Sequence, residues 1–221
     1  GSPEGYLMED QLSWIGAELE KAEADPSVSY VFLIAQEPIF PNGGHLDDSM
    51  WYLGDNNMRA GVFKDGKLVL EKRGIVEVRN EFLTMVSSSR KVAAVLGADE
   101  HAYHRLLVTK DVPVGVLEKD DKDKNGKIDL DKKETCSPLP GLKFSTWFLV
   151  NGGGGAPFYA EEDTPWNSYW TRKPDPAERR RGFYYSSQEN VLMIEASANK
   201  ISVEVYNLHG ELIDQVDDLL G

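Results

Sequence analysis

The pattern of hydrophobic and polar positions predicts two helix–strand units in the first half of the chain. Apolar residues recur at helical spacing over residues 8–22, and a continuous apolar run over residues 30–35 is typical of a buried strand. A second helix is expected over residues 80–88, followed by a second buried strand over residues 92–96. Both predicted strands end in polar segments, where α/β proteins place their functional sites.

The second half of the chain has the pattern of a β-rich structure. Short apolar runs separated by turn residues predict strands over residues 112–117, 145–150, 183–186, 191–196, 201–206 and 212–216. Earlier in the chain, Asp65-Gly66 between two apolar runs predicts a hairpin, whereas residues 166–181 are expected to form a long polar loop. The pattern predicts a mixed α/β fold of α+β character, in a single domain spanning residues 1–221.

The amino-acid composition and net charge argue against some classes of binding partner. Hydrophobic residues make up 41% of the 221 residues and charged residues 28%, which is typical of a soluble globular protein. The net charge of -13 argues against a nucleic-acid partner, and no apolar run is long enough for a membrane span. The single cysteine, Cys136, excludes an intrachain disulfide framework. The basic residues Arg172-Lys173 and Arg179–Arg181 are interpreted as a solvated loop face rather than an anion site.

Residues 121–133 have the spacing of an EF-hand-like calcium loop. Gly126 stands where such a loop bends sharply, and Ile128 can anchor it to a core. The candidate ligands are the side chains of Asp121, Asp123, Asn125 and Asp129 and the carbonyl of Lys127. Position 12 carries Lys132 in place of a bidentate Glu, so weak affinity is expected. The alternative is a solvated loop of mixed charge; in either case residues 118–134 have the character of an insertion.

Asp99 and His101 follow the second predicted buried strand. In an extended segment, residues two positions apart point to the same side, so both side chains can approach one divalent metal ion. A structural loop is the competing interpretation of these two residues.

Four segments carry a resemblance to a known family, in the family's order. They are Gln11–Ile15 with Glu18-Leu19, VFLIAQEPIFP at 31–41, VLGADEHAYHR at 95–105 and FLVNGGGGAPFY at 148–159. They resemble the C-terminal half of calcineurin-like metallophosphoesterases, especially the purple-acid-phosphatase-like branch, and the tail through residues 210–214 resembles the last hairpin of that family. The resemblance implies part of a metallophosphatase-type β-sandwich flanked by helices, and hydrolysis of phosphate esters at a dinuclear metal centre.

The resemblance also implies roles for individual residues. His101 would bind the first metal, while Asp99 and Gln36 would serve the second at positions where the family has histidine. Oxygen ligands favour a harder ion such as magnesium, manganese or calcium over zinc, or these two residues mark a site that no longer binds metal. His45, nine residues after Gln36, is the candidate for catalytic proton transfer or substrate binding, and an exposed loop residue is its alternative.

Most catalytic motifs of the family are absent from this chain. The Asp-x-His, Gly-Asp-x-x-Asp and Gly-Asn-His-Asp/Glu motifs do not occur, so we expect a missing N-terminal half, or a second copy, to pair with the chain. Gly152–Gly155 lacks the Lys-Ser/Thr of a phosphate-binding loop and is expected to be structural. The rival hypothesis is a non-catalytic, calcium-stabilised binding module. The calcium-like loop and the resemblance together favour an extracytoplasmic or secreted location.

Overall fold

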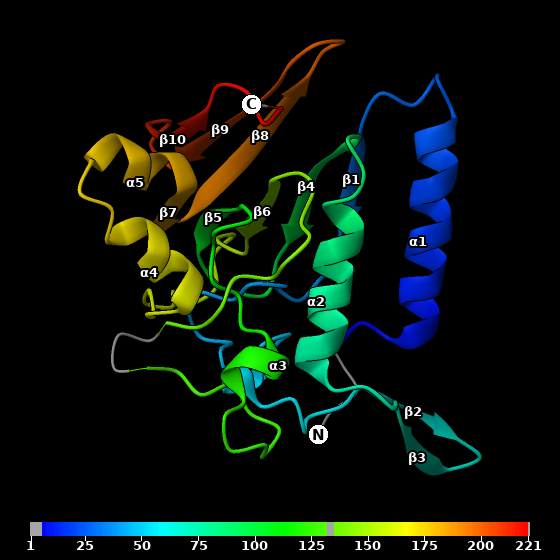
Figure 1. The fold of residues 1–221 in the computed structure, drawn as a ribbon. Coiled ribbons are helices and arrows are strands. Elements are labelled where there is room, and N and C mark those ends of the chain that lie inside the picture. Colours follow the sequence, from blue (N-terminus) through cyan, green and yellow to red (C-terminus); the bar gives the residue numbers. More distant parts are fainter. Residues whose placement is uncertain (1–5, 132–134, 221) are drawn as a thin grey trace.

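A mixed five-stranded sheet lies at the centre of the structure, a computed structural model that describes residues 6–131 and 135–220 (Figure 1). Its strand order is β1-β4-β6-β5-β7. The strands are β1 (Val31–Ile34), β4 (Val92–Gly97), β6 (Thr146–Asn151), β5 (Tyr103–Val108) and β7 (Phe183–Ser186). Neighbours β1, β4 and β6 run parallel, whereas β5 is antiparallel to β6 and β7. The predicted mixed α/β fold class is therefore confirmed.

Two smaller sheets accompany the central one. Strands β8 (Asn190–Ala196), β9 (Ile201–Asn207) and β10 (Leu212–Val216) form an antiparallel sheet, and β2 (Gly61–Lys64) pairs with β3 (Lys67–Leu70). Asp65 and Gly66 join β2 to β3 with φ values of 51° and 75°, as a tight hairpin turn of the primed type requires. The last four predicted strands, and the predicted hairpin, are confirmed.

Helices α1 (Glu9–Ala24) and α2 (Ile75–Val86) lie side by side next to β1 and β4 (Figure 1). Helix α1 buries Leu12 and Leu19 and ends before Asp25-Pro26, as its spacing predicts. Helix α2 begins five residues before its predicted start. Its first turn is capped by Asn56, whose Oδ1 accepts hydrogen bonds from the amides of Val76 (3.1 Å) and Glu77 (3.0 Å). A cap from a distant loop leaves no signal in the helix's own sequence.

The structure corrects three predictions of secondary structure. Residues 112–117 form no strand but an isolated bridge between Pro113 and Pro138, because proline has no amide hydrogen to extend a ladder. A short helix, α3 (Leu117–Asp120), follows. The expected loop at residues 166–181 contains α4 (Pro165–Thr171) and α5 (Pro176–Gly182), each with proline at its first position after a capping Thr164 or Asp175.

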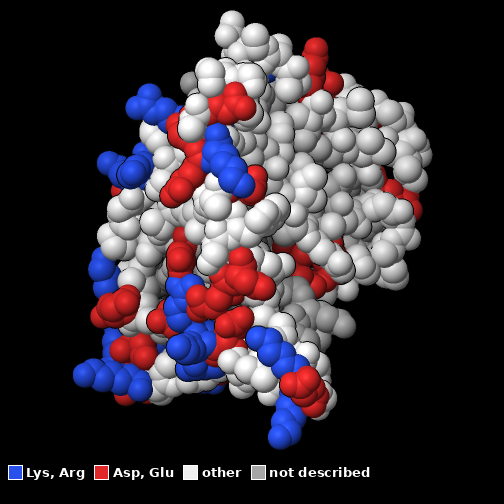
Figure 2. Space-filling model, turned by 90° about the vertical axis from the view of Figure 1, so that its right-hand side faces the viewer, with Lys and Arg blue, Asp and Glu red and all other residues white. Residues whose placement is uncertain are grey.

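The third correction concerns the first predicted buried strand. Strand β1 lies at the edge of the central sheet, and Ile34 is 81% exposed. Beside it, an apolar groove of about 230 Å³ separates β1 from α1, and the exposed Trp14 of α1 lines this groove. Figure 2 shows the side of the molecule on which α1 lies: charged side chains gather on one half of this face, and the other half is almost uncharged.

A buried arginine connects several elements of the core. The guanidinium of Arg79, on α2, lies 4.9 Å from the ring centroid of Trp51, 5.2 Å from that of Phe40 and 5.6 Å from that of Trp166. Arg79 is completely buried and forms no ion pair with any carboxylate of the described residues, and burial lowers its pKa to about 9. The cation is stabilised by the three ring faces and by the carbonyl of Val114.

No helix in the described part of the chain is long and apolar enough to cross a membrane.

Candidate functional site

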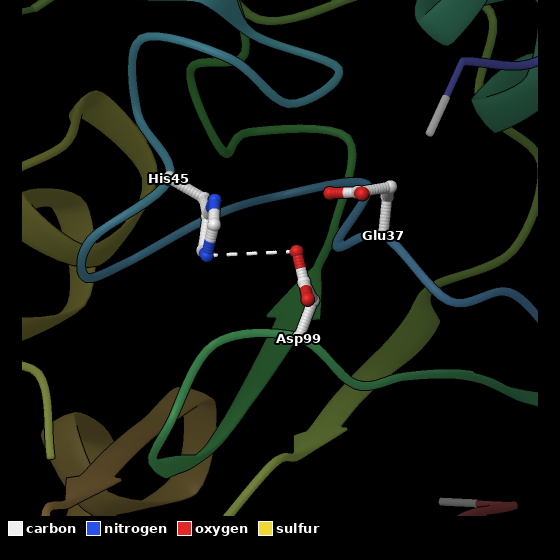
Figure 3. Close-up of side chains that lie close together, drawn as sticks. All are labelled: Glu37, His45 and Asp99. Atoms are coloured by element: carbon white, nitrogen blue, oxygen red, sulfur yellow. Dashed lines mark ion pairs between the residues drawn. The ribbon is translucent and has the colours of Figure 1, made fainter. Parts of the chain in front are cut away.

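Glu37, His45 and Asp99 converge at one edge of the central sheet (Figure 3). One potential ligand atom from each of the three side chains lies within 4.8 Å of the others. Glu37 comes shortly after β1 and Asp99 shortly after β4. Because β1 and β4 are neighbouring parallel strands, their carboxyl ends meet at the same edge, and the loop after β1 brings His45 back to it.

Asp99 has a left-handed backbone conformation, with φ of 65°. Asp and Asn tolerate this region better than other residues with a β-carbon, since their short polar side chains can bond locally. The turn is closed by a hydrogen bond from the amide of Glu100 to the carbonyl of Ala98 (2.8 Å). The consequence is that the Asp99 carboxylate turns back towards His45, with 3.5 Å between Asp99 Oδ2 and His45 Nε2.

His45 is oriented by a second carboxylate. Its Nδ1 lies 2.9 Å from Asp48 Oδ1, so Nδ1 carries the proton of that hydrogen bond and Nε2 faces Asp99. A histidine held in this way presents Nε2 as a ligand atom or proton carrier. Burial acts to lower the pKa of His45, but the hydrogen bond to Asp48 and the nearby charges of Asp99 and Glu37 outweigh it and raise the pKa above its usual value.

Glu37 titrates near neutrality. Partial burial, followed by repulsion from the Asp99 carboxylate, raises the pKa of Glu37 to about 7, although His45 acts in the opposite direction. Two carboxylates placed this close together favour a shared proton or a cation between them. With the imidazole nitrogen of His45, they form an O₂N donor set that divalent transition metals accept.

A buried network below the site fixes the loop that carries His45. Both Glu100 and His104 are fully buried, and Glu100 Oε2 lies 2.5 Å from His104 Nε2. The Glu100 carboxylate also accepts hydrogen bonds from the amides of Asn42 (2.8 Å) and Gly43 (2.6 Å). His45 is two residues beyond Gly43, so the network determines where His45 enters the site.

The direction of the bonds in this network follows from Asn42. Its Oδ1 accepts from the indole N–H of Trp166 (3.1 Å), and its Nδ2 donates to the carbonyl of Phe40 (3.0 Å). The same Nδ2 lies 3.2 Å from His104 Nδ1, which must therefore accept. His104 Nε2 then donates to Glu100, so the Glu100 carboxylate is the acceptor for three donors.

The residues predicted from the sequence are only partly brought together. Asp99 and His45 belong to the cluster, but Glu37, which the sequence analysis did not single out, occupies the place expected for the exposed Gln36. His101 lies outside the cluster: its Nδ1 is 2.8 Å from the carbonyl oxygen of Pro157, and its ring stacks on Tyr159 at 4.4 Å. Glu37 could have been found as the first carboxylate after the apolar run of β1; Asp48 leaves no comparable signal.

Tyr159 links the two histidines. Its ring stacks on His101 and meets His45 edge-on at 5.5 Å. His101 therefore lies beside the site, one ring away from His45, and its Nε2 is not engaged by the Pro157 carbonyl.

The EF-hand-like loop has its oxygens arranged around a common centre. Ligand atoms of Asp121, Asp123 and Asp129 lie within 4.8 Å of one another. Asp121 accepts hydrogen bonds from the amides of Asn125 (2.9 Å) and Gly126 (2.9 Å), and Gly126 has φ of 86°, which explains the glycine. The side-chain oxygen of Asn125 accepts from the amide of Lys127.

This loop is attached to the core by backbone pairing. Ile128 is 5% exposed, and its amide donates to the carbonyl of Gly54 (2.9 Å), while the amide of Asn56 donates to the carbonyl of Gly126 (2.9 Å). The expected anchoring role of Ile128 is thus confirmed. Lys132, at the position of the missing bidentate ligand, lies outside the described residues, as does the end of the insertion predicted over residues 118–134.

Gly152 and Gly153 permit close approach of the backbone. A β-carbon on Gly152 would lie 2.1 Å from the carbonyl oxygen of Glu100, and one on Gly153 would lie 2.1 Å from the side-chain nitrogen of Asn190. The structural interpretation of this glycine run accounts for both contacts.

Comparisons with known proteins give limited similarity. No protein-family model matches the chain, and no curated protein matches it. Among solved structures, the chain is similar to a purple acid phosphatase from yellow lupin (Lupinus luteus) seeds, with 12% sequence identity and a TM-score of 0.46. The match covers 95% of this chain and 28% of that one, so the chain spans little more than a quarter of the length of the lupin protein.

Proposed function

We propose that the chain contributes a divalent-cation site to a metal-dependent phosphoesterase that hydrolyses phosphate esters. The observation that supports this proposal is the convergence of Glu37, His45 and Asp99 within 4.8 Å. They lie at the carboxyl ends of β1 and β4, the two segments at which the sequence resemblance implies metal ligands.

The three side chains would hold the cation through Glu37 and Asp99 oxygens and His45 Nε2. Asp48 fixes the His45 ring by accepting its Nδ1 proton, and the Glu100 network fixes the loop. When bound, a divalent cation supplies Lewis-acid polarisation of a phosphoryl oxygen and acidifies a coordinated water. His101, beyond Tyr159, donates its Nδ1 proton to the Pro157 carbonyl, so its Nε2 would act as a proton acceptor or a ligand beside a bound phosphate ester.

A dinuclear centre needs more ligands than this cluster offers. In-line phosphoryl displacement between two ions requires them about 3.5–4 Å apart, each with its own ligands. We propose that an upstream segment of the same protein supplies the remaining ligands. From this chain, Gln36, directly beside Glu37, and His101, two residues after Asp99, are further candidates.

The enzymatic proposal is tested with a protein that includes the upstream segment. Chromogenic phosphomonoester and phosphodiester substrates are offered with manganese, magnesium or zinc. Asp99→Asn is expected to reduce turnover at least about tenfold, because a ligand carboxylate is lost. Asp47→Asn, an exposed residue on the same loop, is the matched control and should retain activity. Absence of turnover with every metal would reject the enzymatic proposal.

The rival function is a non-catalytic, calcium-stabilised binding module. It is favoured by the exposed Gln36 at the position where the resembled family has histidine. Cation binding at Glu37, His45 and Asp99 without any turnover would support this alternative over the phosphoesterase.

We further propose that the EF-hand-like loop binds calcium weakly and that bound calcium stabilises the packing of this loop against residues 54–57. Millimolar calcium should raise the thermal midpoint, and Asp121→Asn should remove most of the increase, since Asp121 both offers a ligand and closes the loop. Asp65→Asn, in the exposed β2–β3 turn, serves as control. An identical shift in both variants would reject the loop as the calcium site. Weak sites are filled where calcium is millimolar, which supports an extracytoplasmic location.

A further inference from the structure

A groove lined by several basic residues lies at the opposite ends of the strands from Asp99. Two adjoining cavities, of about 920 Å³ and 370 Å³, share Leu107, Phe144, Ser145 and Arg181 in their walls. They extend from α4 and α5, across the starts of β6 and β4, to the C-terminal segment after β10. We call this feature the basic groove.

The basic groove concentrates positive charge on a chain whose net charge is -13. Basic side chains in its walls, apart from the internally paired Arg105, are Arg90, Lys110, Lys143, Lys173, Arg180 and Arg181. None of them forms an ion pair with a carboxylate within the described residues. They outnumber the unpaired carboxylates of the groove, which are Asp111, Glu178, Asp217 and Asp218.

Two of those carboxylates accept hydrogen bonds from the C-terminal segment and from the start of β9. Asp218 Oδ1 accepts hydrogen bonds from the amides of Ile201 (3.2 Å) and Leu220 (3.0 Å), and Asp217 Oδ1 accepts from Gln215 (2.8 Å). These hydrogen bonds fix the positions of the two carboxylates, and neither carboxylate forms an ion pair with Arg180 or Arg181.

The end of α5 that carries Arg180 and Arg181 is fixed by a buried ion pair. The guanidinium of Arg105 donates to both oxygens of Asp214, at 2.5 Å and 3.1 Å, and both residues are almost completely buried. The same guanidinium donates to the backbone carbonyls of Arg180 (2.6 Å) and Arg181 (3.3 Å). The two exposed side chains therefore project from an anchored backbone, which lowers the entropic cost of ordering them on a ligand.

Aromatic rings hold two further cations without neutralising them. The Arg90 guanidinium lies over the Phe144 ring at 5.1 Å, and Lys173 Nζ lies over the Tyr169 ring at 4.0 Å. A cation–π contact orients the charged group but leaves its N–H donors available at the ring's outer side. The Lys173 contact thus lies in the cavity beside α4, whereas the Arg90 contact lies where the two cavities meet, because Phe144 lines both.

We propose that the basic groove binds a small polyanion that carries two or more phosphate groups. Arginine presents paired N–H donors that match phosphate oxygens, whereas lysine acts as a mobile point charge. The volume of the groove is in the range of small-molecule sites and exceeds what one phosphate fills. Because each exposed cation contributes little alone, binding depends on several anionic groups acting together and weakens with salt.

Polyanion binding to the basic groove is tested by calorimetric titration of chelator-treated, metal-free protein with sodium tripolyphosphate. Metal-free conditions make the result independent of the proposed cation site. Arg180→Ala with Arg181→Ala is expected to weaken binding at least about tenfold, since charge-assisted hydrogen bonds are lost. Arg179→Ala removes the neighbouring arginine of the same helix, which does not line the groove, and should bind as the wild type does.

Salt and ligand series complete the test. The affinity for tripolyphosphate should fall as sodium chloride rises, and orthophosphate should bind more weakly than tripolyphosphate. Absence of binding, or equal loss in the double variant and Arg179→Ala, would overturn the proposal. Citrate binding as tightly as tripolyphosphate would overturn the assignment to phosphate.

Discussion

At the scale of single residues, Asp99 combines a left-handed backbone with a position in the proposed cation site. It adopts a left-handed conformation and places its carboxylate beside Glu37 and His45. Strained positions of this kind persist when the surrounding structure fixes them, and they occur frequently at functional sites. For Asp99 the surrounding structure is the turn between β4 and β5 and the backbone of Gly152, which packs against it.

Two substitutions at Asp99 distinguish the effect of backbone strain on stability from the effect of the carboxylate charge. Asp99→Asn keeps a residue that tolerates positive φ and removes repulsion with Glu37, so the metal-free protein should keep its unfolding free energy or gain up to about 1 kcal/mol. Asp99→Ala should cost about 1–2 kcal/mol, because alanine has no local side-chain bond to offset the strain. Urea denaturation measures both; equal losses in the two variants would show that charge and conformation are not separable here.

The raised pKa of Glu37 leads us to expect that the free energy of unfolding depends on pH. Its folded pKa of about 7 lies above the usual value of 4.5, so the folded protein holds a proton that the unfolded chain has released. Its contribution is present below pH 4.5 and is lost as pH rises through 7. Since Glu37 is only partly buried, the effect should be on the order of 1 kcal/mol after solvent screening.

The measurement is urea denaturation of metal-free protein at pH 5 and pH 8. The wild type should lose more stability between these values than Glu37→Gln does. The raised pKa of His45 acts in the same direction, and its largest raising cause, the hydrogen bond to Asp48, remains in both proteins, so the difference reports Glu37 together with the effect of its charge on His45. An identical loss in the two proteins would contradict the assigned titration.

At the scale of elements, the loop between β1 and η1 (Tyr52–Gly54) depends on the segment after β4. Glu100 is acceptor for the amides of Asn42 and Gly43 and for His104, all in buried positions. A neutral side chain there can satisfy only part of this demand. Glu100→Gln should therefore lower the unfolding free energy by about 2–4 kcal/mol.

The control for Glu100→Gln is Glu162→Gln. Glu162 accepts one hydrogen bond from Gly44 in the same loop but is exposed, so its loss should cost under about 1 kcal/mol. Denaturation of both variants is compared with the wild type. A Glu100→Gln protein as stable as the control would contradict the role of the network.

The elements that the sequence predicts well are those whose signal is local. The β2–β3 hairpin follows from Asp65-Gly66, and α1 follows from the spacing of Leu12 and Leu19. Helices α4 and α5 were missed because each has only seven residues, too few to show helical periodicity, although Thr164-Pro165 and Asp175-Pro176 were readable as helix starts. Strand β5 was missed because its central residues, including His104 and Arg105, are buried polar groups satisfied only by tertiary partners.

The sequence predicted where the candidate site lies better than it predicted which residues belong to it. The resemblance implies that Asp99 and Gln36 serve one metal, and the structure places Glu37 beside Asp99. Which of two neighbouring residues points inward depends on the exact end of β1, which periodicity does not fix. The separation of His101 from the cluster depends on its bond to Pro157, a contact 56 residues away in the chain.

At the scale of the whole molecule, the edge of β1 is the surface most suited to a partner strand. Ile34 is 81% exposed, and the apolar groove between β1 and α1 lies beside it. We propose that a strand from the upstream part of the protein, or from a second copy, pairs along this edge.

Sedimentation of the chain alone distinguishes the two partners. Concentration-dependent dimers that Ile34→Lys abolishes would identify a second copy on the β1 edge, whereas Val191→Lys, on the distant β8, should leave them unchanged. A chain that remains monomeric at its highest soluble concentration would exclude self-association and leave the upstream strand as the proposed partner.

The central claim is that Glu37, His45 and Asp99 hold a divalent cation, and calorimetric titration with manganese tests it most directly. Chelator-treated protein carrying Asp121→Asn, which disables the proposed calcium loop, is titrated at pH 8, where Glu37 is ionised. We expect binding that is weakened at least about tenfold when Asp99→Asn is added. The account would be contradicted by the absence of binding heat, or by identical isotherms with and without Asp99→Asn.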